Sequence, residues 1–167
     1  DKSFKSNKGV YSFINENFLL EQNVEKYSKK IYELLKIART QKGLHYIYSL
    51  FDKSGALTIA LAFEANGYAF YSKEGNYDPS GRFVGGKKLL SNMKNARCVI
   101  CGNTQQEDHT DHKFKQGTFI LFTGSETAGV QDALQVYNSI ENKDGHLIKF
   151  VIGSLVSAEG VDYKRIK

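Results

Sequence analysis

Two cysteines and two histidines lie close together in the middle of this sequence. Cys98 and Cys101 form a C-x2-C pair followed by Gly102, and His109 and His112 form an H-x2-H pair. The combined C-x2-C-x7-H-x2-H pattern offers two thiolates and two imidazoles, the ligands of a closed tetrahedral zinc site. Four protein ligands leave no open position, so the pattern predicts a structural zinc ion. The alternative is a pair of buried thiols with exposed histidines beside acidic residues.

A second candidate site is the stretch 149–162, where an apolar strand runs into a loop of small and acidic residues. Residues 150–152 form a short apolar run that contains two β-branched residues, as a central strand of a parallel sheet should. Ligands of open α/β sheets collect at the carboxyl ends of the strands, so this loop is a candidate ligand surface. Ser49, Thr123 and Gly124 also follow predicted strands and would extend the same edge. The alternative is that all of these are ordinary turn residues.

The elements that would position these residues alternate between strand and helix, which predicts an α/β fold with a mostly parallel sheet. An N-terminal arm or linker is expected over 1–23 and a lobe over 24–167, interrupted by an irregular insertion at 72–116 that contains the Cys/His residues. One helical fragment is predicted inside the insertion, over 87–93. Strands are predicted over 44–48, 68–71, 118–122 and 150–152, and helices over 24–38, 57–66 and 131–140.

Composition favours one domain with a real core, since the chain has 167 residues and 41% apolar content. There is no apolar run near eighteen residues and no signal-peptide pattern, so we expect a soluble, non-secreted protein with no membrane partner. Two cysteines in one C-x2-C pair favour a reducing compartment over a disulfide scaffold. The net charge of +5 suits phosphate backbones, although a slightly basic solvated surface would look the same.

Four stretches resemble superfamily 2 helicases of large cytoplasmic DNA viruses, the type found in poxviruses, African swine fever virus and mimivirus. Residues 152–162, IGSLVSAEGVD, look like motif V of that superfamily. Residues 27–31 (YSKKI) and 43–49 (GLHYIYS) are similar to the entry helix and the motif IV strand. Residues 138–145 match an N-S-x-x-N-x-x-G turn found before the motif V strand. The resemblance implies the second RecA-like lobe of such a helicase or early-transcription-factor ATPase, with a three-layer architecture.

This resemblance also implies roles for individual residues. Ser154 would contact a nucleic-acid phosphate, as would Ser49, Thr123 and Gly124 along the same edge. The inter-lobe nucleotide would be contacted by Glu159, Gly160 and Asp162. The implied partners are DNA or RNA, the N-terminal RecA-like lobe of the same polypeptide and viral transcription machinery, in the cytoplasm of the host or in the virion. The implied cofactor of the full-length protein is ATP with magnesium.

The sequence lacks the groups that would hydrolyse ATP. It contains neither the phosphate-binding pattern G-x-x-x-x-G-K-[ST] nor an Asp-Glu pair after a strand, and the arginine-rich motif VI of the family would begin beyond Lys167. Phosphoryl transfer depends on positioning and charge stabilisation by such groups, so we expect no turnover by this chain alone, which we take to be a piece of a longer protein. The alternative function is a zinc-containing nucleic-acid-binding or scaffold module without a motor. A metal-dependent hydrolase is less favoured, because the candidate ligands would saturate the metal.

Overall fold

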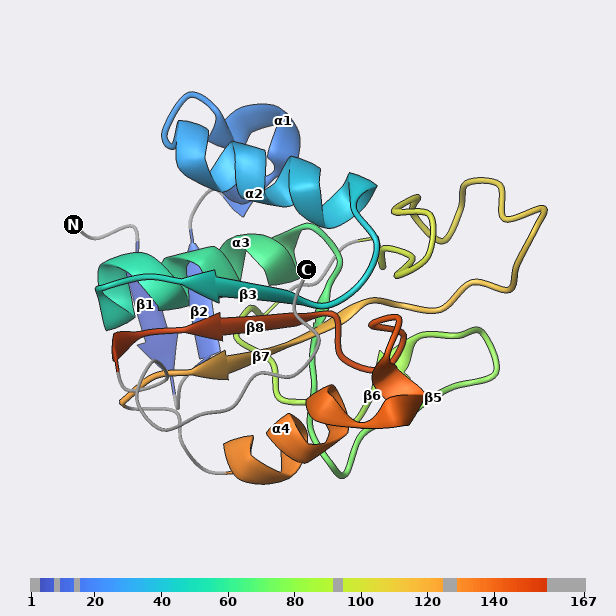
Figure 1. Cartoon of the computed structure of the whole chain (residues 1–167). Helices are drawn as coiled ribbons and strands as arrows, with labels where there is room; N and C mark the ends of the chain where they lie inside the picture. Colours follow the sequence, from blue (N-terminus) through green and yellow to red (C-terminus); the bar gives the residue numbers. More distant parts are fainter. Residues whose placement is uncertain (1–3, 8–9, 14–15, 92–94, 125–128, 156–167) are drawn as a thin grey trace.

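A four-stranded parallel sheet forms the centre of the computed structural model, which describes residues 4–7, 10–13, 16–91, 95–124 and 129–155 (Figure 1). The strand order is β3-β8-β7-β4, and every neighbouring pair is parallel. The predicted α/β class and parallel sheet are therefore confirmed. The strands are β3 (His45–Tyr48), β4 (Ala69–Phe70), β7 (Thr118–Phe122) and β8 (Phe150–Gly153).

Helices cover both faces of the sheet, because its central strands are apolar on both sides. Along β7, Phe119 and Leu121 join the core under α2 and α3, whereas Ile120 and Phe122 join the core over α4. Figure 1 shows α2 and α3 on one side of the sheet and α4 on the other. Among the described residues, no helix has the length and apolarity needed to cross a membrane. The main helical elements are α2 (Lys29–Thr40), a π-helical turn η2 (Asp52–Leu57), α3 (Thr58–Ala65) and α4 (Val130–Asn138).

The helix predicted over 24–38 is two separate elements. The short α1 (Glu21–Val24) ends before Glu25, and α2 begins at Lys29 because the Ser28 hydroxyl accepts the Ile31 amide N–H at 3.2 Å. This is the capping chemistry that serine supplies at a helix start, and the sequence reading overlooked it. The other two predicted helices are confirmed with small shifts at their ends, α4 being followed by η3 (Ile140–Asn142).

Several described residues before α1 pack against the same core. Strands β1 (Phe4–Asn7) and β2 (Val10–Phe13) pair in antiparallel fashion, and η1 (Glu16–Leu19) leads into α1. Leu19 and Val24 are buried in the cluster under α2 and α3, and Phe18 packs against it. Asn66, at the end of α3, accepts the Glu21 amide N–H and donates to the Leu19 carbonyl, both at 2.8 Å. The domain boundary placed after residue 23 stays a prediction.

The insertion at 72–116 has little regular structure. Its described part holds one small hairpin, β5 (Asn76–Tyr77) with β6 (Phe83–Val84), and then irregular chain. The helix predicted over 87–93 is wrong for residues 87–91, and its remainder lies outside the described residues. The buried carboxylate of Glu64 accepts the amide N–H groups of both Leu89 and Leu90, which holds this segment in an irregular, non-helical conformation.

A polar turn sets the position of β8. The side chain of Asn142 is fully buried; its oxygen accepts the amide N–H groups of Leu147 and Ile148, and its nitrogen donates to the carbonyls of Tyr137 and Ile148. Gly145 completes the turn with a φ of 75°, which a side chain would strain. This is the N-S-x-x-N-x-x-G stretch of the sequence, so its asparagine links the end of α4 to the start of the last strand.

Candidate metal centre and strand-end edge

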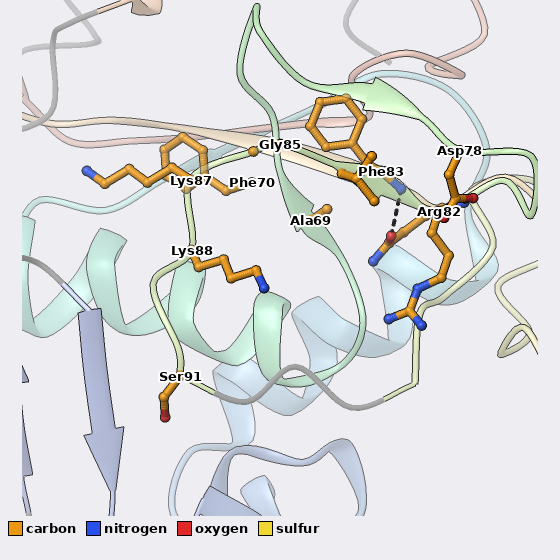
Figure 2. Close-up of a pocket in the computed structure, with 12 residues that line it drawn as sticks. Ala69, Phe70, Asp78, Arg82, Phe83, Gly85, Lys87, Lys88 and Ser91 are labelled. Atoms are coloured by element: carbon orange, nitrogen blue, oxygen red, sulfur yellow. Dashed lines mark hydrogen bonds between the residues drawn. The ribbon is translucent and has the colours of Figure 1, made fainter.

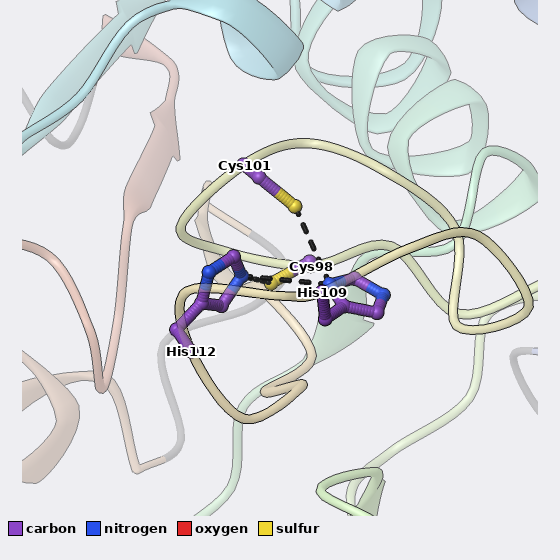
Figure 3. A group of neighbouring side chains, drawn as sticks. All are labelled: Cys98, Cys101, His109 and His112. Carbon is purple, nitrogen blue, oxygen red and sulfur yellow. Dashed lines mark hydrogen bonds between the residues drawn. The ribbon is translucent and has the colours of Figure 1, made fainter.

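The four Cys and His side chains predicted from sequence converge on one point (Figure 3). One ligand atom from each lies within 4.8 Å of all the others. The Cys98 Sγ lies 3.3 Å from the His112 Nε2, and the Cys101 Sγ lies 3.5 Å from the His109 Nδ1. The two imidazole nitrogens, His109 Nδ1 and His112 Nε2, are 3.4 Å apart.

These separations are those of a tetrahedral coordination shell. With zinc-sulfur bonds of about 2.3 Å and zinc-nitrogen bonds of about 2.05 Å, the sulfur-nitrogen edge should be about 3.5 Å and the nitrogen-nitrogen edge about 3.3 Å. The observed values agree within a few tenths of an ångström. The donor set and its spacing therefore fit a tetrahedral metal ion such as zinc.

The protonation of His109 agrees with a ligand role. Its Nε2 lies 3.0 Å from the Thr104 carbonyl oxygen, so Nε2 carries the proton and Nδ1 presents a lone pair. A hydrogen bond of this kind to the distal nitrogen is the usual support of a metal-bound histidine.

The local backbone explains how the two sulfurs reach one point. The Gly102 amide N–H donates to the Cys98 carbonyl, closing the turn between the cysteines, and Gly102 has a φ of 77°. A Cβ at Gly102 would meet the Arg39 carbonyl oxygen at 2.2 Å, so this turn lies directly against the end of α2. The Arg97 guanidinium donates to the Gly102 carbonyl at 2.8 Å and fixes the turn from the other side.

The strand-end residues also come together, at the opposite end of the sheet. Ser49, Ser154 and Thr123 directly follow β3, β8 and β7, which are neighbours in that order. The Ser49 amide donates to the Gly153 carbonyl at 2.9 Å, and the Ser154 amide donates to the Phe122 carbonyl at 3.0 Å. In Figure 1 the carboxyl ends of these strands lie on the left, and the β5-β6 hairpin lies on the right.

These residues differ in exposure. Gly124 is exposed, whereas Ser49 and Thr123 are buried and Ser154 is fully buried. Contact between the Ser154 hydroxyl and a phosphate would therefore require movement of the chain around it. The roles of these four residues stay predictions. Glu159, Gly160 and Asp162 lie outside the described residues.

Sequence reasoning missed two exposed apolar residues beside Ser49. Leu50 is 59% exposed and Phe51 is 63% exposed. The Ser49 hydroxyl bonds to the backbone of Phe51, and a Cβ at Gly55 would meet that hydroxyl at 1.8 Å, so the loop folds tightly over the end of β3. The sequence signal that could have found them is a pair of apolar residues, Leu50 and Phe51, directly after Ser49, where the strand has already ended.

Comparison with known proteins gives distant viral relatives. A protein of African swine fever virus (strain Badajoz 1971 Vero-adapted) named early transcription factor large subunit homolog is 27% identical over 145 residues, which cover 85% of this chain and 11% of that protein. The "Putative ATP-dependent RNA helicase L377" of Acanthamoeba polyphaga mimivirus is 28% identical over 176 residues, covering 93% of this chain and 14% of that protein. The early transcription factor 70 kDa subunit of monkeypox virus is 25% identical over 140 residues, covering 84% of this chain and 17% of that protein. No family model matches the chain.

These comparisons support a helicase-like family of large DNA viruses, in agreement with the resemblance found in the sequence motifs. The chain spans less than a fifth of the length of each of these three relatives. The similarity therefore concerns a small part of much larger proteins.

Proposed function

We propose that this chain is the second RecA-like lobe of a viral superfamily 2 ATP-dependent helicase. The observation that carries the proposal is the parallel sheet, whose order places Ser49, Ser154 and Thr123 on three adjacent strand ends. Carboxyl ends of parallel strands are the usual ligand edge of open α/β sheets. Similarity to viral proteins with helicase and early-transcription names supports the same assignment.

In this role the lobe supplies contacts and leaves hydrolysis to other parts of the protein. Hydroxyl groups at the strand ends, together with the exposed Gly124, would hold phosphates of a DNA or RNA strand once the chain around Ser154 has moved, and the exposed ring of Phe51 offers a stacking surface for a base. Glu159, Gly160 and Asp162 would contact the nucleotide between lobes. ATP with magnesium would be held mainly by the N-terminal lobe of the same polypeptide, because this sequence lacks the phosphate-binding lysine pattern.

The cellular setting follows from the same relatives. The African swine fever virus and monkeypox virus relatives are named as early transcription factor subunits, so we propose viral transcription machinery as a partner. The corresponding location is a viral factory in the host cytoplasm, or the virion.

A binding and turnover experiment tests this function. The purified chain should bind labelled single-stranded DNA or RNA weakly, with affinity that falls as salt rises, and should not hydrolyse ATP. Thr123→Val removes one strand-end hydroxyl and should weaken binding, while Thr40→Val, at the end of α2, is the matched control. ATP turnover by the chain alone, or equal binding by the two variants, would count against the strand-end assignment.

The Cys/His cluster favours a structural zinc ion, and with it a second candidate function. If no motor partner exists, the chain would be a zinc-containing nucleic-acid-binding or scaffold module. Zinc would be held by Cys98, Cys101, His109 and His112, and it would fasten the insertion where apolar core is scarce. Elemental analysis should find about one zinc per chain, lost in Cys98→Ser. Cobalt substitution should give a tetrahedral absorption spectrum, and a metal-free chain with an unchanged melting temperature would refute the site.

A further inference from the structure

A cavity of about 450 Å³ opens between β4, the β5-β6 hairpin and the segment 85–91 (Figure 2). Its lining includes Phe70 on the edge strand β4 and Phe83 on β6. Arg82 lies at one side, and Lys88 and Ser91 lie at the other. The cavity belongs to the insertion and lies apart from both the strand-end edge and the Cys/His cluster.

Positive charge dominates this cavity. Three cations, Arg82, Lys87 and Lys88, line it, against the single carboxylate of Asp78. That carboxylate is engaged in its own turn, since it accepts the amide N–H groups of Ser80 and Arg82 at 2.8 and 3.0 Å and the Ser80 hydroxyl at 2.7 Å. Arg82 lies close enough to Asp78, and Lys88 close enough to Glu64, for each cation to interact electrostatically with the carboxyl beside it, so an incoming anion would meet an excess of positive charge that these carboxyls compensate only in part.

Two of the cations face each other across the cavity. In Figure 2 the Arg82 guanidinium and the Lys88 ammonium extend into it from opposite sides, while the Lys87 side chain points away. Within the described part of the chain, neither Arg82 nor Lys88 forms an ion pair. Lys87 instead lies 5.7 Å from the centre of the Phe70 ring.

The backbone that carries these cations is fixed on both sides. The Leu89 amide, next to Lys88, is bound to the buried Glu64 carboxylate at 2.9 Å. The Phe83 amide, next to Arg82, is bound to the Gln116 side-chain oxygen at 3.0 Å. Between them, a Cβ at Gly86 would meet the Phe70 carbonyl oxygen at 2.3 Å, so the chain lies tight against β4. The backbone of the site therefore loses little conformational entropy on binding, whereas the side chains of Arg82 and Lys88 must still be ordered.

The binding chemistry differs from that of a nucleotide-binding P-loop. Residues 81–88, GRFVGGKK, match the P-loop spacing except that Lys88 stands where serine or threonine is required. A P-loop leads into a helix whose N-terminus receives the phosphates, whereas residues 85–91 are irregular. Any anion here would be held by the Arg82 and Lys88 side chains.

We propose that this cavity binds a phosphate group of a single-stranded nucleic acid, with the guanidinium of Arg82 and the ammonium of Lys88 as its two ligands. Guanidinium presents parallel N–H groups to two phosphate oxygens, and the ammonium supplies a compact second charge. The inference adds a contact away from the strand-end edge, although it shares the nucleic-acid ligand of the proposed function. Free phosphate offers the same oxyanion, so the test separates the two sources.

The experiment compares two double variants with equal charge loss. Arg82→Gln/Lys88→Gln removes the cavity cations, and Lys30→Gln/Lys36→Gln removes two exposed cations of α2 as the control. Fluorescence anisotropy with a labelled oligothymidylate, over a series of salt concentrations, gives affinity and salt slope. Loss of the contact to this one phosphate should lower the slope of log affinity against log salt by about 0.7 and weaken binding by roughly tenfold relative to the control. Equal melting temperatures of the two variants would exclude a folding defect.

Inorganic phosphate, followed by amide NMR shifts of Gly85 to Leu89, is the second arm. Shifts in the wild-type chain that vanish in Arg82→Gln/Lys88→Gln, together with the weakened oligonucleotide binding, support the inference. Phosphate shifts with unchanged oligonucleotide affinity would mean a free-phosphate site and overturn the nucleic-acid source. If phosphate causes no shifts and Arg82→Gln/Lys88→Gln leaves oligonucleotide affinity unchanged, while Thr123→Val still weakens binding, the proposed phosphate site in the cavity is refuted and the proposed function is not. No oligonucleotide binding by the wild-type chain would overturn the proposed function and the nucleic-acid ligand of the cavity together.

Discussion

Replacing Glu64 with glutamine should change how the stability of this domain depends on pH. Glu64 lies in the last turn of α3 and is fully buried, and its carboxylate accepts the amide N–H groups of Leu89 and Leu90. Burial raises the pKa of the Glu64 carboxyl from 4.5 to about 7, although the two amide hydrogen bonds and the charge of Lys88 act to lower it.

The sign follows from proton binding. Between pH 4.5 and about pH 7 the folded chain holds a proton that the unfolded chain has lost, so the free energy of unfolding falls as the pH rises. This loss of stability is absent below the unfolded-state pKa of 4.5 and complete above the folded-state pKa of about 7. At about 1.4 kcal/mol per pH unit, the difference between the two pKa values corresponds to about 3 kcal/mol.

Urea unfolding of the wild type and of Glu64→Gln measures this directly. The chain has ten tyrosines and no tryptophan, so tyrosine fluorescence and far-UV circular dichroism are suitable probes. Between about pH 4 and about pH 8, the free energy of unfolding of the wild type should fall by about 3 kcal/mol relative to that of the variant. Histidine protonation and metal release affect both proteins equally and cancel in the difference. The reasoning would be refuted if the difference in unfolding free energy between the two proteins did not change with pH, or if the wild type became more stable relative to the variant as the pH rises.

Three further substitutions test separate parts of the structure. Asn142→Ala leaves the amides of Leu147 and Ile148 without their side-chain acceptor and should lower the free energy of unfolding by about 3 kcal/mol, measured by urea unfolding, whereas an exposed Asp144→Ala should change little. Gly102→Ala places a Cβ at a left-handed backbone position against the Arg39 carbonyl. It should lower the free energy of unfolding by at least about 2 kcal/mol and reduce the zinc content found by elemental analysis. Full zinc content together with unchanged stability would contradict this geometry. Phe51→Ala should weaken oligonucleotide binding about fivefold to tenfold without changing the melting temperature, since the ring is 63% exposed, and unaltered affinity would remove Phe51 from the nucleic-acid surface.

The sheet was predictable because its strands are buried on both faces. Residues 118–122 and 150–152 read as continuous apolar runs, and such runs are typical of central parallel strands. The Asn66-Gly67 end of α3 was also predictable, since Gly67 takes a φ of 95°, a conformation that favours glycine at a helix end. Local chemistry decides these features, so the sequence pattern is enough.

The insertion could be predicted only in part, because contacts between distant residues decide its path. Leu89 and Leu90 look like the apolar side of a helix, yet Glu64, twenty-five residues before Leu89, binds both amides and keeps the chain out of a helix. The Cys/His cluster was found because its four ligands are close in sequence. The Arg82 and Lys88 cavity was not, because it needs the hairpin β5-β6 and the Glu64 contact to bring the two cations to opposite sides.

The strand register argues that the cavity and the strand-end edge can be changed independently. Phe70, in the cavity wall, pairs in register with Phe119, whereas the edge begins four residues later along β7, at Thr123. At about 3.3 Å per residue this offset is about 13 Å, beyond the 7–10 Å within which substitutions usually couple. A nucleic-acid strand could therefore reach both the cavity and the strand-end edge only by running alongside β4 and β7. The Cys/His cluster lies at the other end of the sheet from the carboxyl ends of the strands. A metal ion there would stabilise the insertion without touching the strand-end edge.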